Sequence, residues 1–272
     1  MIRAGLVLAL ALTSCTGERQ PPPASGPPLT IVSLNPCTDA ILHEVTAPGQ
    51  LVAISHYSMD PGASSMQPGD AARYRATGGS VEEVLALDPD VVVASTYLAP
   101  ATRAAFDDLG VPVVQFGGVA SVDESFAQIR ELAALTGHTA KGEALVARIE
   151  AALDKVKADA ASQRPETVVW QPGEIVAGEA ALVSDLLRRA GFESYSAARG
   201  LAQADYLPLE RVIADPPELL LVAGSAAGQR HPVLSKVKSM RREHFDARLI
   251  YCGGPSIIRA AERLRQIMAT GA

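Results

Sequence analysis

The sequence predicts an α/β protein built from two similar halves that one long helix joins. Short apolar segments alternate with amphipathic segments along most of the chain, which is typical of parallel sheets covered by helices. The longest uninterrupted helical pattern, residues 141–161, lies near the middle of the chain. A segment of the first half, residues 80–92, has a counterpart at residues 208–220. These three observations together indicate the two-halved fold.

The first half is predicted to contain strands separated by helices. Residues 91–94 form a continuous apolar run between polar turns, as expected of a buried parallel strand. Similar runs predict further strands at residues 30–34, 50–55 and 111–116. Residues 60–75 are rich in Pro, Gly, Ser and Asp and lack periodicity, which predicts a loop. We predict helices at residues 39–45 with Thr38 as cap, 81–87 with Ser80 as cap, and 101–109 before Gly110.

Helical periodicity then dominates the middle of the chain. Residues 122–135 predict one helix and residues 141–161 a longer one. The longer helix has one buried face, because apolar residues recur at steps of three and four: Leu145, Ile149, Leu153 and Val156. The alternation of strands and helices restarts beyond it. We predict strands at residues 167–170, 219–222 and 248–251, and helices at residues 180–190, 209–214 and 256–268.

The two copies of the repeated segment share one order of features. Each has a short helix with an acidic first turn, a proline stop and a buried strand. Glu82 and Glu210 occupy matching places in the two copies. Because the pattern occurs only twice, it indicates pseudo-symmetry between the halves and not a solenoid.

The N-terminus predicts secretion and a lipid anchor. Arg3 precedes an apolar run, residues 4–12, that is too short to span a bilayer and therefore indicates a secretion signal. Leu12-Thr13-Ser14-Cys15 resembles the site where bacterial lipoprotein signals are cut and the cysteine is acylated. We expect a signal peptide at residues 1–14 and lipidation of Cys15; the alternative is an ordinary signal with an incidental cysteine. Residues 15–28 are Pro-rich and predict an extended tether.

Composition excludes some classes of function. The chain is 48% hydrophobic and 20% charged, which is ordinary for a globular protein. Its net charge is −6 and it has no basic run, which argues against nucleic acid as a partner. No apolar stretch after residue 12 approaches 18 residues, so no further membrane span is expected.

Several segments resemble the periplasmic substrate-binding proteins of bacterial ABC importers for ferric siderophores, heme and vitamin B12. They are Val32-Ser33-Leu34-Asn35-Pro36, the turn Ser55-His56-Tyr57-Ser58 and both repeated segments. The block from residue 35 to 93 is most similar to a vitamin B12-binding protein. The resemblance implies the class III periplasmic-binding-protein fold, in which two Rossmann-like lobes, residues 29–136 and 165–272, are joined by a rigid helix, residues 137–164.

The resemblance also implies the protein's partners. A metal–organic chelate would be held between the lobes and delivered to a permease with its ATPase, and the protein would be a periplasmic monomer held to a membrane by its lipid. In the family, one surface glutamate per lobe docks onto transporter arginines, and Glu82 and Glu210 match those positions. The alternative is that these acids only stabilise their helices, because a negative charge interacts favourably with the positive end of the helix dipole. Each such interaction contributes roughly 0.3–1 kcal/mol.

Cys37, His56 and Cys252 each follow a predicted strand closely and are expected at the cleft. Three interpretations stay open. Thiolate and imidazole suit soft and borderline metals, so these residues could contact a chelate or its metal. An oxidising compartment permits a Cys37–Cys252 disulfide. The third interpretation is two small buried thiols. The spacing of these residues matches no metal motif, so we predict neither a certain metal site nor a cofactor.

Aromatic residues near predicted strand ends complete the expected cleft. Aromatic walls suit a flat or apolar chelate; the alternative for each residue is packing at the surface or hinge. The several tryptophans of the vitamin B12 pocket are missing, and no basic run marks an acidic siderophore, so the sequence leaves the chelate open. The aromatic candidates are Tyr57, Tyr97, Trp170 and Tyr206, and their neighbours in the expected cleft are Asn35, Pro36, Gly253 and Gly254.

Two other classes of function are alternatives to a binding protein. An envelope hydrolase would need a Cys37–His56 nucleophile pair, but the sequence offers no visible orienting acid, and the usual hydrolase, phosphate-binding, zinc and dinucleotide motifs do not occur. A passive envelope lipoprotein would not need the cleft that a two-lobed α/β unit creates. We therefore expect a binding protein and no enzyme.

Overall fold

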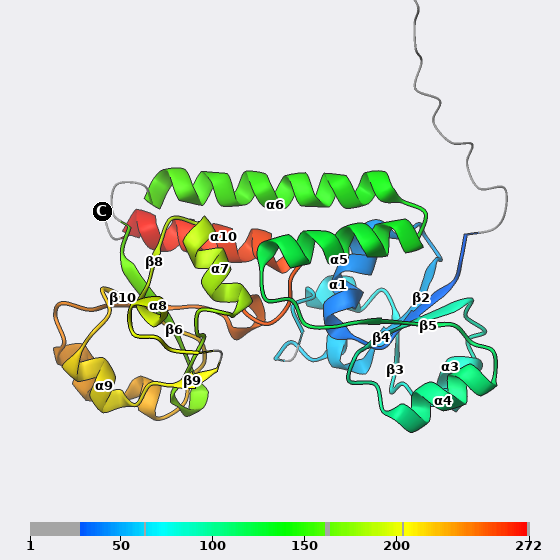
Figure 1. Cartoon of the computed structure of the whole chain (residues 1–272), viewed down its shortest axis with the longest axis horizontal. Coiled ribbons are helices and arrows are strands. Elements are labelled where there is room, and N and C mark those ends of the chain that lie inside the picture. Colours follow the sequence, from blue (N-terminus) through cyan, green and yellow to red (C-terminus); the bar gives the residue numbers. More distant parts are fainter. Residues whose placement is uncertain (1–27, 63, 161–163, 203, 271–272) are drawn as a thin grey trace, which may run out of the picture.

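The computed structural model describes residues 28–62, 64–160, 164–202 and 204–270. Two sheets lie end to end beneath one long helix, α6 (Thr139–Ala160), as Figure 1 shows. This arrangement confirms the predicted α/β fold with a long joining helix. The predicted signal peptide, Cys15 and the tether fall outside the described residues, apart from Pro28.

The first sheet is parallel throughout, as predicted, in the order β3-β2-β1-β4-β5. One of its strands lies where we predicted only a loop. The short edge strand β3 and a one-turn helix, α2 (Pro68–Ala71), both escaped the sequence patterns because neither is long enough to show a period. The strands are β1 (Ile31–Ser33), β2 (Leu51–Ser55), β3 (Arg75–Thr77), β4 (Val91–Ser95) and β5 (Val113–Phe116).

Helix α1 (Pro36–Val45) begins three residues before its predicted start. Asn35, and not Thr38, is its cap: the Asn35 side-chain oxygen accepts a hydrogen bond from the Cys37 backbone N–H at 3.0 Å. Proline is favoured at the first helical position, where its missing N–H is not needed. The other helices of this half are α3 (Val81–Leu85), capped by Ser80 as predicted, α4 (Pro100–Asp108) and α5 (Val122–Leu135).

The second sheet is mixed, so the prediction of a parallel sheet is wrong for this half. Its order is β11-β10-β6-β7-β9, with β8 paired to β6, and β7 runs antiparallel to both β6 and β9. The strand predicted at residues 248–251 is also wrong. A single 3-10 turn, Ala247–Leu249, lies there, whereas the edge strand β11 has the polar sequence RREH and gave no apolar signal.

Of the remaining elements, β6, α7 and α10 lie close to their predicted bounds and α9 and β10 match them, whereas β7, β8, β9, β11 and α8 were not predicted. The strands are β6 (Glu166–Gln171), β7 (Ile175–Val176), β8 (Glu193–Ser194), β9 (Asp205–Tyr206), β10 (Leu219–Val222) and β11 (Arg241–His244). The helices are α7 (Leu182–Arg189), α8 (Tyr195–Ala198), α9 (Leu209–Ala214) and α10 (Ser256–Thr270). Short 3-10 segments include η1 (His56–Met59) and η2 (Pro172–Glu174).

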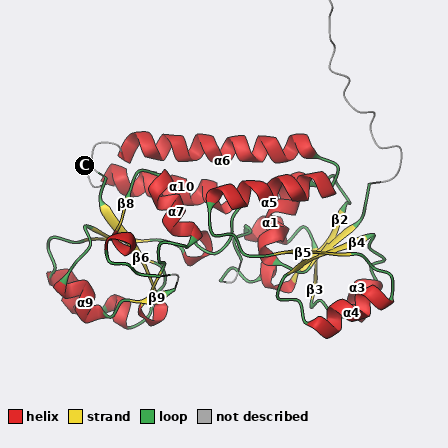
Figure 2. Ribbon diagram, in the orientation of Figure 1, coloured by secondary structure: helices red, strands yellow, loops and turns green. Residues whose placement is uncertain are grey.

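Alternation along the strands divides the interior into layers. Val91 and Val93 of β4 face a core formed with α1, α5 and α6, whereas Val92 packs on the opposite face against α3 and α4. In the second sheet, Leu219 and Leu221 join that same large core, and Leu220 faces α8 and α9. Figure 2 shows helices on both sides of each sheet.

One core therefore runs through both halves. It contains residues from both sheets and from α6, which packs along α5 and α10. Gly142 lets α6 approach α5 closely, because a Cβ there would lie 2.5 Å from the Ala133 Cβ. Within the described ranges, no helix combines the length and apolar character that a membrane crossing requires.

Candidate ligand-binding cleft

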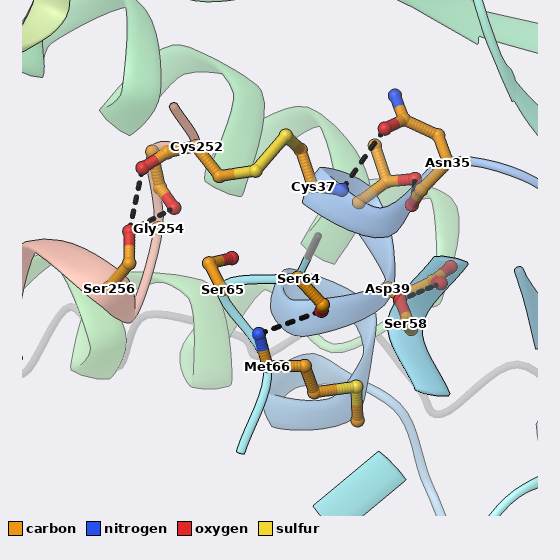
Figure 3. The surroundings of a disulfide bond; sticks show 12 residues. Asn35, Cys37, Asp39, Ser58, Ser64, Ser65, Met66, Cys252, Gly254 and Ser256 are labelled. Atoms are coloured by element: carbon orange, nitrogen blue, oxygen red, sulfur yellow. Dashed lines mark hydrogen bonds between the residues drawn. A yellow bond between two sulfur atoms is a disulfide. The ribbon is translucent and has the colours of Figure 1, made fainter. Parts of the chain in front are cut away.

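A disulfide joins the two halves of the molecule. Cys37, in the first turn of α1, is bonded to Cys252, which precedes α10; their Cα atoms are 5.1 Å apart although 215 residues separate them in the sequence (Figure 3). Of the three interpretations left open, the structure shows the disulfide. The interpretations of these cysteines as free thiols, as thiolate ligands or, for Cys37, as a nucleophile are wrong, because a disulfide sulfur is not a thiolate.

Gly253 and Gly254 are buried beside this disulfide, and not exposed in a cleft as predicted. A Cβ on Gly253 would lie 2.4 Å from the Ser125 Oγ, and one on Gly254 would lie 2.6 Å from Ile41. The Gly254 backbone has a φ of +73° and its N–H donates to the Ser125 Oγ at 2.7 Å. The two glycines therefore let the chain pass between α1 and α5.

A hollow of about 410 Å³ lies where the two halves meet. Val119, from the loop after β5, borders it on one side, and residues of the second half, including Gln171, Leu182 and Tyr251, form the rest. None of the described residues that line it is charged. Such a surface suits an uncharged or apolar face of a ligand.

The sequence analysis missed Tyr251. Its ring is 59% exposed at this hollow, and its hydroxyl donates to the Gln171 side-chain oxygen at 3.0 Å. We predict it as the last residue of a strand at residues 248–251, whereas the structure has a 3-10 turn, Ala247–Leu249, and no strand there. The available signal was its position directly before Cys252.

Most of the predicted aromatic candidates are exposed near the carboxyl ends of strands, which is where ligands bind in α/β sheets. Tyr57 and Tyr97 follow β2 and β4 and are 54% and 89% exposed. Tyr206 is 59% exposed at the end of β9, which runs in the same direction as β6. The ring of His56 lies on that of Tyr57 with 4.1 Å between the ring centres, and its Nδ1 is 3.3 Å from the Thr77 carbonyl.

Trp170 does not lie at the surface. Its side chain is fully buried, and its indole N–H donates to the Leu207 carbonyl at 2.9 Å. The structure thus places its side chain in the core of the second half, which neither the cleft interpretation nor packing at the surface or hinge predicts, and Trp170 borders a hollow of about 330 Å³ in that half. Asn35 is likewise buried as the α1 cap, and Pro36 and Cys37 are half-buried.

Glu174 connects Tyr206 to helix α9 beside this same hollow of about 330 Å³. Its carboxylate accepts hydrogen bonds from the Tyr206 hydroxyl and from the Leu209 backbone N–H, the latter at 2.9 Å. The hydrogen bond to Glu174 raises the pKa of Tyr206 above its usual value. The φ of Glu174 is +61°, a conformation that few residues other than glycine adopt.

Asp39 is a buried carboxyl group below the turn that carries His56 and Tyr57. It is fully buried, and its Oδ2 accepts hydrogen bonds from the Ser55 backbone N–H at 3.0 Å and from the Ser58 hydroxyl at 2.6 Å. Burial raises the pKa of Asp39 to about 7 despite these hydrogen bonds. No sequence pattern distinguishes Asp39 from an ordinary acid at a helix start, so this role could not be predicted.

Glu82 and Glu210 are exposed in the first turns of α3 and α9. Figure 1 shows these two helices on the side opposite α6, one in each half. The neighbouring Glu83 binds the chain just before α3, since its carboxylate accepts from the Gly78 N–H at 2.7 Å and from the Thr77 hydroxyl at 2.9 Å. Among the described residues, neither Glu82 nor Glu210 shares in a side-chain hydrogen bond or ion pair.

The chain is similar to several known binding proteins. It is 25% identical over 209 residues to a cobalamin-binding protein of Halobacterium salinarum (strain ATCC 29341 / DSM 671 / R1); the match covers 73% of this chain but only 55% of that protein, so the chain spans about half the length of this curated relative. The fold matches that of the periplasmic heme-binding protein RhuT from Roseiflexus sp. RS-1, with a TM-score of 0.69, 23% identity, and 89% of this chain and 97% of that chain covered.

It also matches the fold of the periplasmic vitamin B12-binding protein BtuF of Vibrio cholerae, with a TM-score of 0.67, 18% identity, and 90% and 98% of the two chains covered. The family model for periplasmic binding proteins matches residues 31–250, which is most of the chain. The chain therefore belongs to the periplasmic binding protein family.

Proposed function

We propose that this chain is the substrate-binding component of an ABC importer and captures a metal–organic chelate: a ferric siderophore, heme or a corrinoid. The observation that carries the proposal is the uncharged hollow of about 410 Å³ between the halves. Exposed aromatic rings follow the carboxyl ends of strands in both halves. Relatives that bind cobalamin, heme and vitamin B12 support this class of ligand.

The hollow, together with exposed rings that lie outside its lining, would fit a large ligand with flat, apolar faces. Tyr57, Tyr97 and Tyr206 offer ring faces for stacking and hydroxyl groups for hydrogen bonds. His56 adds the imidazole through which the cleft would contact the metal or its chelator. We propose no catalytic step, and the disulfide removes the Cys37 nucleophile that the hydrolase alternative required.

Delivery requires docking onto the permease. We assign this contact to Glu82 and Glu210, because both are exposed and belong to α3 and α9, helices of opposite halves that Figure 1 shows on the same side of the molecule. Carboxylates at matching positions would pair with transporter arginines and fix the orientation of the complex. We further propose lobes at residues 29–136 and 165–272, a connector at residues 137–164 and a monomeric protein.

The same proposal places the mature protein in the periplasm, anchored through lipidated Cys15. Residues 1–14 would be removed and residues 15–28 would tether the domain to the membrane surface. Two or more acyl chains suffice for stable anchoring at roughly 0.8 kcal/mol per buried CH₂. Mass spectrometry of the native N-terminus checks this: a diacylglyceryl-cysteine is expected, and an unmodified N-terminus at another residue would contradict it.

The ligand class is tested with a panel of chelates. Hemin, cyanocobalamin, a ferric hydroxamate and a ferric catecholate are titrated into the protein by calorimetry and thermal shift. One of them should bind with 1:1 stoichiometry and stabilise the fold by about 2.7 kcal/mol at one hundred times its dissociation constant. Tyr57→Ala and Tyr251→Ala should weaken binding about tenfold or more, whereas Leu109→Ala, an exposed control at the end of α4, should not.

A different ligand class would overturn the proposal. Saturable binding of a sugar, an amino acid or a peptide, with no chelate bound, would contradict the assigned substrate. Equal affinity of wild type and both tyrosine variants would contradict the assigned cleft.

A further inference from the structure

The turn η1 carries two side-chain rings of the proposed binding site. One buried group binds the chain on both sides of these two residues. Ser55 directly precedes the turn and Ser58 lies within it, so they flank His56 and Tyr57. A single oxygen of Asp39 accepts a hydrogen bond from the backbone N–H of the first and the hydroxyl of the second, at 3.0 and 2.6 Å. Figure 3 shows Asp39 and Ser58 close to the Cys37–Cys252 disulfide. The turn is thus fixed to α1 through one carboxyl group.

Fixing the turn with a buried carboxyl group lowers the stability of the fold. Asp39 is fully buried, and its second oxygen, Oδ1, has no hydrogen-bond partner in the described part of the chain. An unpaired buried polar atom and a desolvated charge both cost stability. A neutral acceptor would satisfy the same two donors without the charge. Strongly perturbed ionisable groups of this kind cluster at functional sites.

We propose that Asp39 is a positioning residue: its carboxyl group, while neutral, holds the turn that bears His56 and Tyr57 in the shape that receives the ligand, and its ionisation loosens that turn. The part that concerns the ligand rests on the proposed function of the cleft. The part that concerns the turn does not depend on the identity of any ligand.

Charged neighbours do not dominate the titration of Asp39. On its own helix, His43 contacts Tyr74 and Asp70, and Glu44 pairs with Arg148 of α6. From the other elements that pack nearby, Lys141 of α6 binds the Thr46 carbonyl, Arg259 of α10 reaches the Ser65 carbonyl, and His56 of η1 faces the Thr77 carbonyl. Strands β1 and β2 contain no ionisable side chains. Burial is therefore the main cause that raises the pKa of Asp39 to about 7.

The direction of the pH effect follows. Burial raises the pKa of Asp39, so the state in which the turn covers it favours the neutral acid, whereas a turn that opens to water favours the carboxylate. Above pH 7 the ionised group therefore favours the open turn, which gains motion. A ligand that needs the ordered turn should bind more tightly at pH 5.5 than at pH 8, by roughly three- to tenfold.

The first experiment needs no ligand. In the wild-type protein, the amide proton of Ser55 should shift with a midpoint near pH 7, and the heteronuclear NOE of Tyr57 should fall as the pH rises through 7. Asp39→Asn should abolish the shift and hold the Tyr57 NOE at its low-pH value, whereas His56→Gln should leave the Ser55 titration unchanged. A Ser55 amide that does not titrate between pH 5.5 and 8 in wild type would overturn the proposal.

The second experiment measures affinity for whichever probe of the panel binds. The dissociation constants of wild type and Asp39→Asn should agree at pH 5.5 and differ three- to tenfold at pH 8. An unchanged pH profile in Asp39→Asn would reject Asp39 as the positioning residue. If none of the probes binds, the proposed function fails, while the Ser55 and Tyr57 signals still decide whether Asp39 controls the turn.

Discussion

Asp39 also gives the folded state a pH-dependent stability. Its pKa is raised from 3.8 to about 7, so the folded protein holds this proton more tightly than the unfolded chain. Its contribution is therefore full below about pH 4 and is lost as the pH rises through 7. Between pH 5 and pH 8 the loss amounts to about 2–3 kcal/mol.

Asp39→Asn should remove this part of the pH dependence. We expect the difference in free energy of unfolding between wild type and Asp39→Asn to change by about 2–3 kcal/mol from pH 5 to pH 8, in favour of the variant at the higher pH. Urea unfolding at several pH values measures it. A difference that stays constant across this range would show that the carboxyl group titrates normally.

The positions of some single residues could be predicted from the sequence, and those of others could not. The exposed candidates His56 and Tyr57 were found because they follow an apolar run, and strand ends can be read from such runs; Tyr206 was chosen only as an aromatic residue in a loop between predicted elements. Trp170 and Asp39 could not be placed in the same way. Their burial depends on which neighbours the sheets and α1 bring to them, and no local pattern encodes those contacts.

The helices and strands differ in how clearly their sequences predict them. Helix α5 (Val122–Leu135) has its predicted bounds because Ser121 caps it and its apolar residues recur on one face. The edge strands β3 and β11 are short and polar, so neither propensity nor alternation marks them. The reversed strand β7 is only two residues long, which is why the second sheet was predicted to be parallel.

Helices α3 and α9 carry the proposed docking contacts. Glu82→Ala combined with Glu210→Ala should weaken binding to the cognate permease in detergent or liposomes by about tenfold or more, because two charge pairs at an interface would be lost. Ligand affinity should not change, since both side chains are exposed outside the hollow between the halves.

A matched pair controls for net charge. Glu131→Ala with Glu150→Ala removes the same charge from exposed positions of α5 and α6, away from α3 and α9, and should leave docking intact. Equal docking by wild type and the Glu82/Glu210 variant would reject the assigned contacts, as would an equal loss in the control pair.

At the scale of the whole molecule, the two halves are held together by more than the joining helix. The disulfide links α1 to the segment before α10, and the Asp185 carboxylate of α7 accepts the Val122 N–H of α5 at 2.8 Å. Arg189 of α7 forms an ion pair with Asp123 of α5. Together with the shared core, these contacts favour a cleft that is largely formed before the ligand arrives.

The disulfide should contribute strongly to stability. Replacing both cysteines, Cys37→Ser with Cys252→Ser, should lower the free energy of unfolding by about 2–5 kcal/mol, since the bond closes a long loop. Denaturant unfolding in the absence of reductant measures the effect. If wild type with and without reductant and the double variant all unfold at the same midpoint, the bond would not contribute as the structure indicates.

The central claim is that a metal–organic chelate binds between the two halves. The most direct measurement is an anomalous difference map, recorded at the absorption edge of the bound metal, from crystals of the protein with the chelate that the panel selects. The account predicts one strong peak between the turn that bears His56 and Tyr57 and the second-half residues Tyr206 and Tyr251. A peak on the outer face of α6 or α10, or none in crystals grown at saturating chelate, would contradict it.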